Sequence, residues 1–331
     1  MNNTVIIGAG AIGTALGNAI SYDTDINIQL LTIEKEVADH INRYHKNHLY
    51  FPYIDLNTRL TASLNPEVLR DADFIFLAIP SSVTISYLNE IREFIPANSI
   101  LINLAKGFGN GSKSTIVELL KENFSNETGS LKGPTFAREL IENSPTAFTF
   151  ACENPAWFKR ISDLFEKTVV YCDFTTDIKG VELMSILKNI YAIVLGITDA
   201  RFNSPNLRFM LLTNTFKELR KIVLKHGGQE DSLFKYCGIG DFGLTSLNDL
   251  SRNRTLGLFI GKGFFTKDIS DKVLLEGKLA TRTFYEKYSI EDQKSEFPII
   301  WNLYQVFCND LSIHKFIDNI FEKKTDSNQL R

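Results

Sequence analysis

The first residues whose types and spacing suggest chemistry are Gly8, Gly10 and Gly13, which form the pattern G-x-G-x-x-G in TVIIGAGAIGTALGNAI. In this pattern the first glycine makes a tight turn, the second lets backbone amides approach a pyrophosphate, and the third lets a helix pack closely on its strand. A β-branched run precedes the glycines and a small-residue helical pattern follows, so the free amides of the helix start would face the phosphates. This context predicts a dinucleotide site, whereas the pattern alone also fits a plain strand-to-helix corner.

Glu34 follows Gly13 by 21 residues, near the end of the second expected strand. A carboxylate at this place accepts hydrogen bonds from the ribose diol of NAD and repels the additional phosphate of NADP. Lys35 and Glu36 come next, so the alternative is a solvated residue at a strand end. We therefore predict NAD as the cofactor, with NADP as the alternative.

Lys188 lies in VELMSILKNIYAIVLGI, a segment that is apolar on nearly every side. Lysine is rarely buried, and desolvation lowers the pKa of its ammonium toward the range useful for proton transfer. Two other interpretations remain: the stem could be buried while the amine reaches water, or the lysine could pair structurally with Glu182.

A possible anion site lies in GIGDFGLTSLNDLSRNRTLGLFIGKG, residues 238–263. Ser251 is a plausible helix cap, which would place Arg252 and Asn253 in the first turn, where unbonded amides attract anions. The planar guanidinium of arginine suits a phosphate. The alternative is an ordinary charged helix start.

Composition restricts the class of protein. The chain has 331 residues, 44% of them hydrophobic and 23% charged, with a formal net charge of −3. Without a basic block, nucleic acid is excluded as a main partner. The four scattered cysteines give neither a zinc ribbon nor a disulfide framework, so we expect no metal and a reducing, cytoplasmic compartment. The apolar stretch Val181–Ile197 contains Glu182, Lys188 and Asn189, which predicts a buried helix rather than a membrane span.

These residues need elements to position them, and the first half of the chain alternates between strand and helix patterns. Near-continuous apolar strands alternating with amphipathic helices indicate a parallel sheet covered on both faces. The expected strands are Thr4–Ile7, Ile26–Ile33, 72–80, 99–105, 146–151 and 169–174. The expected helices between them are Ala11–Ile20, Glu36–Tyr44, 81–95 with a serine start, and 157–167.

After about residue 178, helical periods dominate, over 181–200, 207–226 and 297–322, and the final residues KKTDSNQLR form a polar tail. We therefore predict an α/β fold in two domains. Residues 1–178 form a Rossmann-type, doubly wound and mostly parallel sheet, and residues 179–331 form an all-α domain. The boundary falls at Asp177–Gly180.

Several segments together resemble the soluble NAD(P)-dependent glycerol-3-phosphate dehydrogenase family, which interconverts dihydroxyacetone phosphate and sn-glycerol 3-phosphate, a glycerophospholipid precursor. The resemblance covers about residues 4–310, and its last three segments are far more specific than the glycine loop. The segments are GAGAIGTALG, AKGF at Lys106, GPTFARE at 133–139, ELMSILKNIYAI around Lys188, GIGDFGLTSLNDLSRNR, and LLEGKLATRTFY at 274–285.

The resemblance implies roles for individual residues. Lys188 matches the general acid/base, Asn189 lies beside it, and Lys106 and Asp241 complete the catalytic group. Substrate contacts are implied for Lys106, Gly133, Thr135, Lys188, Asp241, Thr245, Ser251, Arg252 and Asn253. Cofactor contacts are implied for Gly8, Gly10, Ala11, Ile12, Gly13, Glu34, Lys106, Ala137, Arg252 and Glu276. The family also implies a homodimer and a small phosphorylated substrate, with no membrane and no nucleic acid as partner.

The chain departs from the family pattern in two places. Many bacterial members have arginine or histidine where this chain has Ile33, which favours NAD. The usual glycine-rich turn after Asp199 is replaced by ARFNSPNLRF, and a family arginine is Asn214 here, although Arg208 keeps another. These changes leave the exact polyol phosphate open.

Two other functions remain open at the level of sequence. One is a related β-hydroxyacid-type dehydrogenase acting on another substrate, against which the segment SRNR argues. The other is a non-catalytic NAD-sensing protein. Such proteins commonly lose the residue that transfers the proton, whereas Lys188, Lys106 and Asp241 are all present here.

Overall fold

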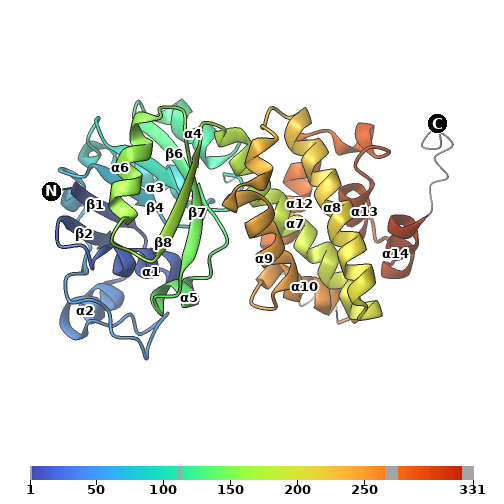
Figure 1. The fold of residues 1–331 in the computed structure, drawn as a ribbon, viewed down its shortest axis with the longest axis horizontal. Coiled ribbons are helices and arrows are strands. Elements are labelled where there is room, and N and C mark those ends of the chain that lie inside the picture. Colours follow the sequence, from blue (N-terminus) through green and yellow to red (C-terminus); the bar gives the residue numbers. More distant parts are fainter. Residues whose placement is uncertain (1, 110–113, 265–274, 323–331) are drawn as a thin grey trace. The chain divides into compact units, whose positions relative to one another are not determined.

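The computed structural model describes residues 2–109, 114–264 and 275–322, with side chains in the last range from residue 277 onward (Figure 1). The expected polar tail at 323–331 lies outside the described residues.

An eight-stranded sheet forms the first part of the fold, in the order β3-β2-β1-β4-β5-β6-β7-β8. Neighbouring strands are parallel except β6 and β7. Strand β1 pairs with β2 on one side and with β4 on the other, so the strand order reverses there, and ligands of open α/β sheets bind outside the carboxyl ends of strands at such a point. The strands are β1 Asn2–Ile7, β2 Ile26–Leu31, β3 Thr61–Ser63, β4 Phe74–Leu77, β5 Ile100–Asn103, β6 Glu127–Lys132, β7 Thr146–Cys152 and β8 Val170–Thr175.

Helices flank the sheet and then form the second part of the chain. Those of the first part are α1 Ala11–Ile20, α2 Lys35–Tyr44, α3 Thr84–Glu90, α4 Ile116–Asn123, α5 Ala137–Ile141 and α6 Ala156–Phe165. Those that follow are α7 Ile178–Phe202, α8 Pro205–Lys225, α9 Asp241–Leu247, α10 Arg252–Gly261, α12 Leu275–Lys287, α13 Pro298–Cys308 and α14 Ile313–Phe321. The predicted fold class is confirmed.

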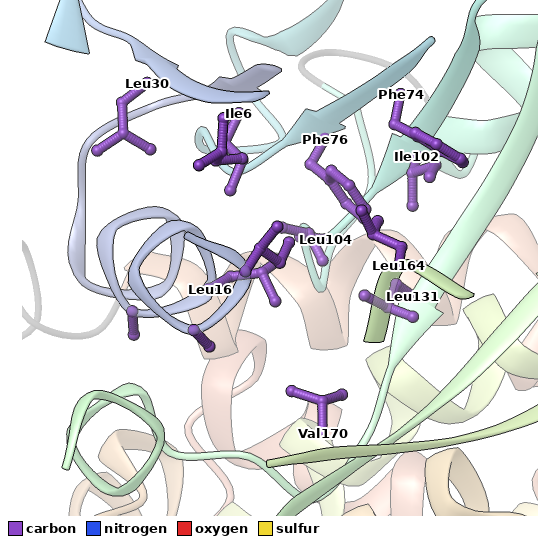
Figure 2. Packing of buried hydrophobic residues seen from close by; sticks show 14 of the residues in the cluster. Ile6, Leu16, Leu30, Phe74, Phe76, Ile102, Leu104, Leu131, Leu164 and Val170 are labelled. Carbon is purple, nitrogen blue, oxygen red and sulfur yellow. The ribbon is translucent and has the colours of Figure 1, made fainter. Parts of the chain in front are cut away.

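The sheet has a hydrophobic core on each face because successive side chains of a strand point to opposite sides. In β1, Ile6 packs in one cluster while Val5 and Ile7 pack in the other. Figure 2 shows the first cluster, in which Ile6 lies near Leu16 of α1. Leu88 of α3 and Leu120 of α4 belong to the opposite cluster. The central strands β4 and β5 are buried along their whole length, whereas β8 at the sheet edge is only partly buried.

Several elements differ from the expectation, among them two helices and one strand. The helix expected over 81–95 begins only at Thr84, ends at Glu90 and is followed by a 3-10 turn over Arg92–Phe94. The helix expected over 297–322 is two helices, because Asp310 has a positive φ of 52° and Ser312 caps a new helix start. Strand β6 was not expected, because its sequence ETGSLK is polar although five of its six residues are buried.

The chain forms two compact units, and each unit is built from two separate stretches of the chain. The first unit comprises residues 1–186 and 223–242, and the second comprises residues 187–222 and 243–331. The expected domains instead meet after residue 178. The physical reason lies at Asp177, whose carboxylate accepts hydrogen bonds from the amide of Gly180 (2.8 Å), the amide of Gln229 (2.7 Å) and the hydroxyl of Ser232 (2.7 Å). These bonds hold residues of the returning segment 223–242 in the first unit.

Helix α7 is the apolar segment for which burial was predicted. It is the one helix in the described part of the chain that is long and apolar enough to cross a membrane by length and composition. Its most apolar window is 94% buried inside the protein, as in the core helix of a globular domain.

Candidate functional site

The glycine loop combines a tight corner with an open space. Gly8 has a φ of 109°, and its amide donates to the carbonyl of Leu31 at 2.8 Å. A Cβ on Gly13 would lie 2.0 Å from the Gly8 carbonyl oxygen, so only glycine lets α1 approach the loop. At Gly10, in contrast, the nearest atoms to an added Cβ belong to Tyr50, at 4.0 Å. The fold requires the first and third glycines, whereas the second leaves room for a ligand beside the start of α1.

A cavity of about 430 Å³ lies beside this loop, at the carboxyl ends of β1, β2 and β4. It is lined by glycine-loop residues, Glu34, Tyr50 and residues of α3. Among the described lining residues, Glu34 and Glu90 are the charged ones, and both are acidic. The open cradle at Gly10 and the carboxylate at Glu34 fit a dinucleotide whose pyrophosphate binds the loop and whose ribose lies at the end of β2.

Asn47 anchors the segment that carries Tyr50, a feature that sequence reasoning missed. Its buried side-chain amide donates to the carbonyl of Ala9 (2.8 Å) and to the hydroxyl of Thr14 (2.9 Å). The Thr14 hydroxyl itself donates to Ala9 (3.1 Å). The glycine loop is therefore held by hydrogen bonds from a segment more than 30 residues away. A contact between such distant residues cannot be predicted from a local sequence pattern.

Lys106 and Asp241 come together in the first unit. Lys106 follows the end of β5 by three residues, and its side chain is 37% exposed. Its Nζ lies 3.9 Å from Oδ2 of Asp241, which is buried and is the first residue of α9. Thr245 lies one turn further along α9 and is buried as well. The predicted grouping of a lysine at a strand end with a buried aspartate is present.

The segment from Gly133 to Ala137 passes close to β7. A Cβ on Gly133 would lie 2.2 Å from the carbonyl oxygen of Ala147, so a side chain at this position is excluded. The hydroxyl of Thr135 lies 2.7 Å from that of Thr146 and donates to Ala147 at 3.2 Å. Ala137 is the first residue of α5. Thr135 therefore has a structural role in joining its loop to β7, whatever else it contacts.

Lys188 and Asn189 lie on α7, in the second unit. Lys188 is 1% exposed, so its amine does not extend into open solvent. Its other proposed partner, Glu182, is instead bound by Asn103, Ser130 and Lys132. The whole side chain of Lys188 is thus buried, which is the condition that its proposed chemistry needs, and its catalytic role stays a prediction.

The start of α10 has the predicted cap. The Ser251 hydroxyl accepts from the amide of Arg254 at 3.3 Å, Arg252 is exposed, and Asn253 is half-buried. Gly277 of α12 lies beside them, since a Cβ on it would be 3.1 Å from Oδ1 of Asn253. Glu276 is the preceding residue of α12, but its side chain lies outside the described residues.

Arg254, which was considered only as an alternative cation for the phosphate, is buried and supports this helix start. Its guanidinium bonds to Asp199 (2.6 Å), to Asp249 (3.0 Å) and to the carbonyl of Ser246 (3.2 Å). Among the described residues, no cluster of histidine, cysteine or acidic side chains could hold a metal ion.

Comparisons with known proteins agree along the whole chain. Residues 3–158 match the N-terminal part, and residues 177–318 the C-terminal part, of NAD-dependent glycerol-3-phosphate dehydrogenase. A glycerol-3-phosphate dehydrogenase [NAD(P)+] of Leptospira biflexa is 33% identical over 86% of this chain and 89% of its own length. Another, from Methanothermobacter thermautotrophicus, is 30% identical over 96% of this chain and 97% of its own length.

Solved structures agree with this assignment. The crystal structure of glycerol-3-phosphate dehydrogenase from Coxiella burnetii has a TM-score of 0.86 at 25% identity, covering 97% of this chain and 99% of that one. The enzyme from Saccharomyces cerevisiae, at 20% identity, shares the fold with a TM-score of 0.86 and the same coverage. With both halves of the family matched along the chain, the chain belongs to the NAD-dependent glycerol-3-phosphate dehydrogenase family.

Proposed function

We propose that this chain reversibly reduces dihydroxyacetone phosphate to sn-glycerol 3-phosphate with a nicotinamide cofactor. The observation that carries the proposal is the combination, within one compact unit, of an open dinucleotide cavity and the Lys106–Asp241 pair. The bound cofactor supplies the hydride that reaches the carbonyl carbon. The remaining tasks, which are binding, orientation and proton transfer, fall to residues of the chain.

The glycine loop holds the pyrophosphate. Backbone amides at Gly10, Ala11 and Ile12 stand at the start of α1, where the unbonded N–H groups and the helix dipole favour an anion. No side-chain cap occupies this helix start. Ala137, Arg252 and Glu276 are proposed as further cofactor contacts on the family match.

We further propose that NAD is the preferred form of the cofactor. Glu34 accepts hydrogen bonds from the ribose diol, and Glu90 adds a second negative charge to the same cavity. A 2′-phosphate would meet two carboxylates and, among the described lining residues, no cation.

The ratio of kcat/KM for NADH and NADPH tests this preference. Glu34→Gln should bring this ratio of kcat/KM values closer to one, and adding Glu90→Gln should bring it closer still. Glu36→Gln, a matched change in the first turn of α2 outside the cavity lining, should leave the ratio unchanged. A native preference for NADPH would contradict the proposal.

Lys188 donates the proton to the carbonyl oxygen as hydride arrives, and it accepts the proton in the reverse direction. Asn189 lies next to it, and Lys106, Asp241 and Thr245 orient the substrate oxygens. Gly133 and Thr135 are proposed as substrate contacts at the end of β6. Ser251, Arg252 and Asn253 bind the phosphate, so that its binding energy orients the reacting carbonyl.

The direct test is the absorbance of NADH with the purified chain and dihydroxyacetone phosphate. We expect oxidation of NADH that requires the phosphorylated ketone, and the reverse reaction with sn-glycerol 3-phosphate. A panel of carboxylate-bearing ketones serves as the control for a β-hydroxyacid-type dehydrogenase. No turnover with any substrate, but tight NADH binding, would instead indicate a nucleotide-sensing protein.

As partners and location we propose a homodimer in the cytoplasm. Exposed apolar side chains of the second unit, among them Phe202, Phe209 and Met210, give such a dimer surface to bury. Light scattering should return twice the 37.5 kDa of one chain. A monomer over the working concentration range would contradict this proposal.

A further inference from the structure

A buried ion pair lies behind the segment that carries Lys106. Lys132, the last residue of β6, and Glu182, on the second turn of α7, are both almost fully buried. Nζ of Lys132 is 3.3 Å from Oε1 of Glu182. Glu182 also accepts from the side-chain amide of Asn103, at 3.1 Å, and from the hydroxyl of Ser130. Three donors from two adjacent strands thus converge on one carboxylate.

The same network fixes the main chain next to Lys106. Lys132 donates to the carbonyl oxygen of Asn103 at 2.9 Å. The Asn103 side chain accepts from the amide of Ala105 (2.8 Å) and donates to the carbonyl of Ala105 (3.2 Å). Asn103 is therefore held through its backbone and its side chain, and it in turn holds both polar groups of the residue before Lys106. Any shift of Lys132 or Glu182 reaches Lys106 through Asn103 and Ala105.

Stability alone does not account for an ion pair in this place. Replacing a buried pair by apolar residues of similar volume is often neutral or stabilising, whereas removing one partner is strongly destabilising. Burial lowers the pKa of Lys132, an effect that Glu182 partly offsets, and the charges of Lys106 and Asp241 act on the same lysine. The pair is thus placed where it affects the geometry and the electrostatics of the Lys106–Asp241 pair, which lies 3.9 Å apart.

We propose that Lys132 and Glu182 are a positioning pair for the reaction. They fix the turn at the end of β5, and this turn aims Lys106 at the substrate. Neither residue is assigned a contact with substrate or cofactor. The inference rests on the proposed role of Lys106 as a substrate-contacting residue.

The test compares single and double variants in kcat, in KM for dihydroxyacetone phosphate and in NADH affinity measured by fluorescence. Lys132→Met and Glu182→Gln each leave one buried group without its partner, so both should lower the melting temperature. The double variant Lys132→Met/Glu182→Gln leaves no unpaired charge and should recover most of that stability. It should nevertheless keep a loss of about ten- to a hundredfold in kcat/KM for dihydroxyacetone phosphate, because the bond from Lys132 to Asn103 is still missing.

NADH affinity should change by no more than about a few-fold in the double variant, because the glycine loop is untouched and Lys106 is only one of the residues implied to contact the cofactor. Recovery of both stability and kcat/KM in the double variant would overturn the proposal and leave the pair a purely structural one. Should the single variants not fold, the double variant alone decides between these results.

Arg160→Met is the control for a change in an ion pair away from Lys106, although this pair is half-buried rather than fully buried. Arg160 pairs with Asp73 at 2.9 Å. This pair lies beside the amino end of β4, whereas Lys106 follows the carboxyl end of β5. Arg160→Met should lower stability without changing KM for dihydroxyacetone phosphate.

Lys106→Ala separates this inference from the proposed function. If Lys106→Ala turns over normally, the role of Lys106 itself is wrong. If Lys106→Ala is inactive and the ion-pair variants behave as the native enzyme does, only the positioning role is wrong. The proposal predicts that Lys132→Met adds little to the loss already caused by Lys106→Ala, because both act through one side chain.

Discussion

Helix α7 carries a buried carboxylate near each end, and the two serve different units in different ways. Glu182 lies in the first unit and takes one cation, Lys132, from a neighbouring strand. Asp199 lies in the second unit and takes two, Arg208 at 2.8 Å and Arg254 at 2.6 Å. Each carboxylate supports a segment that carries a cation proposed to bind the substrate. The support of Lys106 runs through main-chain hydrogen bonds, whereas that of Arg252 comes from Arg254, two residues further along α10.

The segment that departs from the family pattern after Asp199 contributes to the second of these arrangements. The segment after Asp199 has lost the usual glycines, yet it contributes Arg208, which bonds to both carboxylate oxygens of Asp199 at 2.9 and 2.8 Å. Asn214, where the family has an arginine, is exposed on α8. The altered segment therefore takes part in holding the buried aspartate to which Arg254 is bonded.

Lys188 lies on α7 between the two carboxylates, and its removal should have the largest effect. Lys188→Ala should lower kcat by roughly a hundred- to ten-thousandfold, the usual contribution of a positioned general acid, while NADH binding survives. Lys188→Arg should restore little, because a guanidinium does not release its proton near neutral pH. Steady-state kinetics and NADH fluorescence check both variants. Near-normal turnover in either one would mean that Lys188 has only a structural role.

Arg252→Ala tests the function of the segment that Asp199 supports. It should cost about 2–5 kcal/mol in kcat/KM with dihydroxyacetone phosphate, as when one partner of a desolvated charge pair is lost. With plain dihydroxyacetone the cost should be much smaller, because that substrate has no phosphate to bind.

The interaction energy between the mutation and phosphate removal is the quantity to measure, since any contact of Arg252 with the cofactor affects both substrates equally. An interaction energy near zero would move the phosphate site to another cation, with Lys106 and Arg254 the first to test.

Glu218 is a third buried carboxyl group. Unlike Glu182 and Asp199, it is held by neutral hydrogen-bond donors. The amides of Ile299 and Ile300, each at 2.9 Å, and the hydroxyl of Tyr191, at 3.1 Å, donate to it. Burial, only partly offset by these hydrogen bonds, raises the pKa of Glu218 from 4.5 to about 7. Between these two values the folded protein binds a proton more tightly than the unfolded chain does. Stability should therefore fall as the pH rises from about 4.5 to about 7 and then level off.

The free energy of unfolding should fall by about 2–3 kcal/mol over this interval, because a tenfold difference in proton affinity between the folded and unfolded chain corresponds to about 1.4 kcal/mol. Urea unfolding at several pH values measures it, and Glu218→Gln should flatten the dependence in this window. A variant with the native pH dependence would assign the effect to other groups.

Features whose bonding partners lie only a few residues away could be predicted from the amino-acid sequence. The glycine loop could be predicted because its tightest contact, between Gly13 and the carbonyl of Gly8, lies within the loop itself. The cap at Ser251 could be predicted because its hydroxyl bonds to an amide three residues ahead. The alternation of strands and helices followed from periodicity, since the side-chain pattern of an apolar strand is set by its own geometry.

Contacts between groups that are distant in the sequence became known only from the tertiary structure. Strand β6 escaped prediction because its polar residues are buried against partners that the local pattern does not show, as when Lys132 reaches Glu182 of α7, 50 residues further along. The clamp of Asn47 on the glycine loop and the pairing of Asp199 with Arg254 are equally remote in sequence. A hydrogen bond within one turn is fixed by backbone geometry. The partner of a buried charge depends on which segments pack together, and this packing is a property of the whole fold.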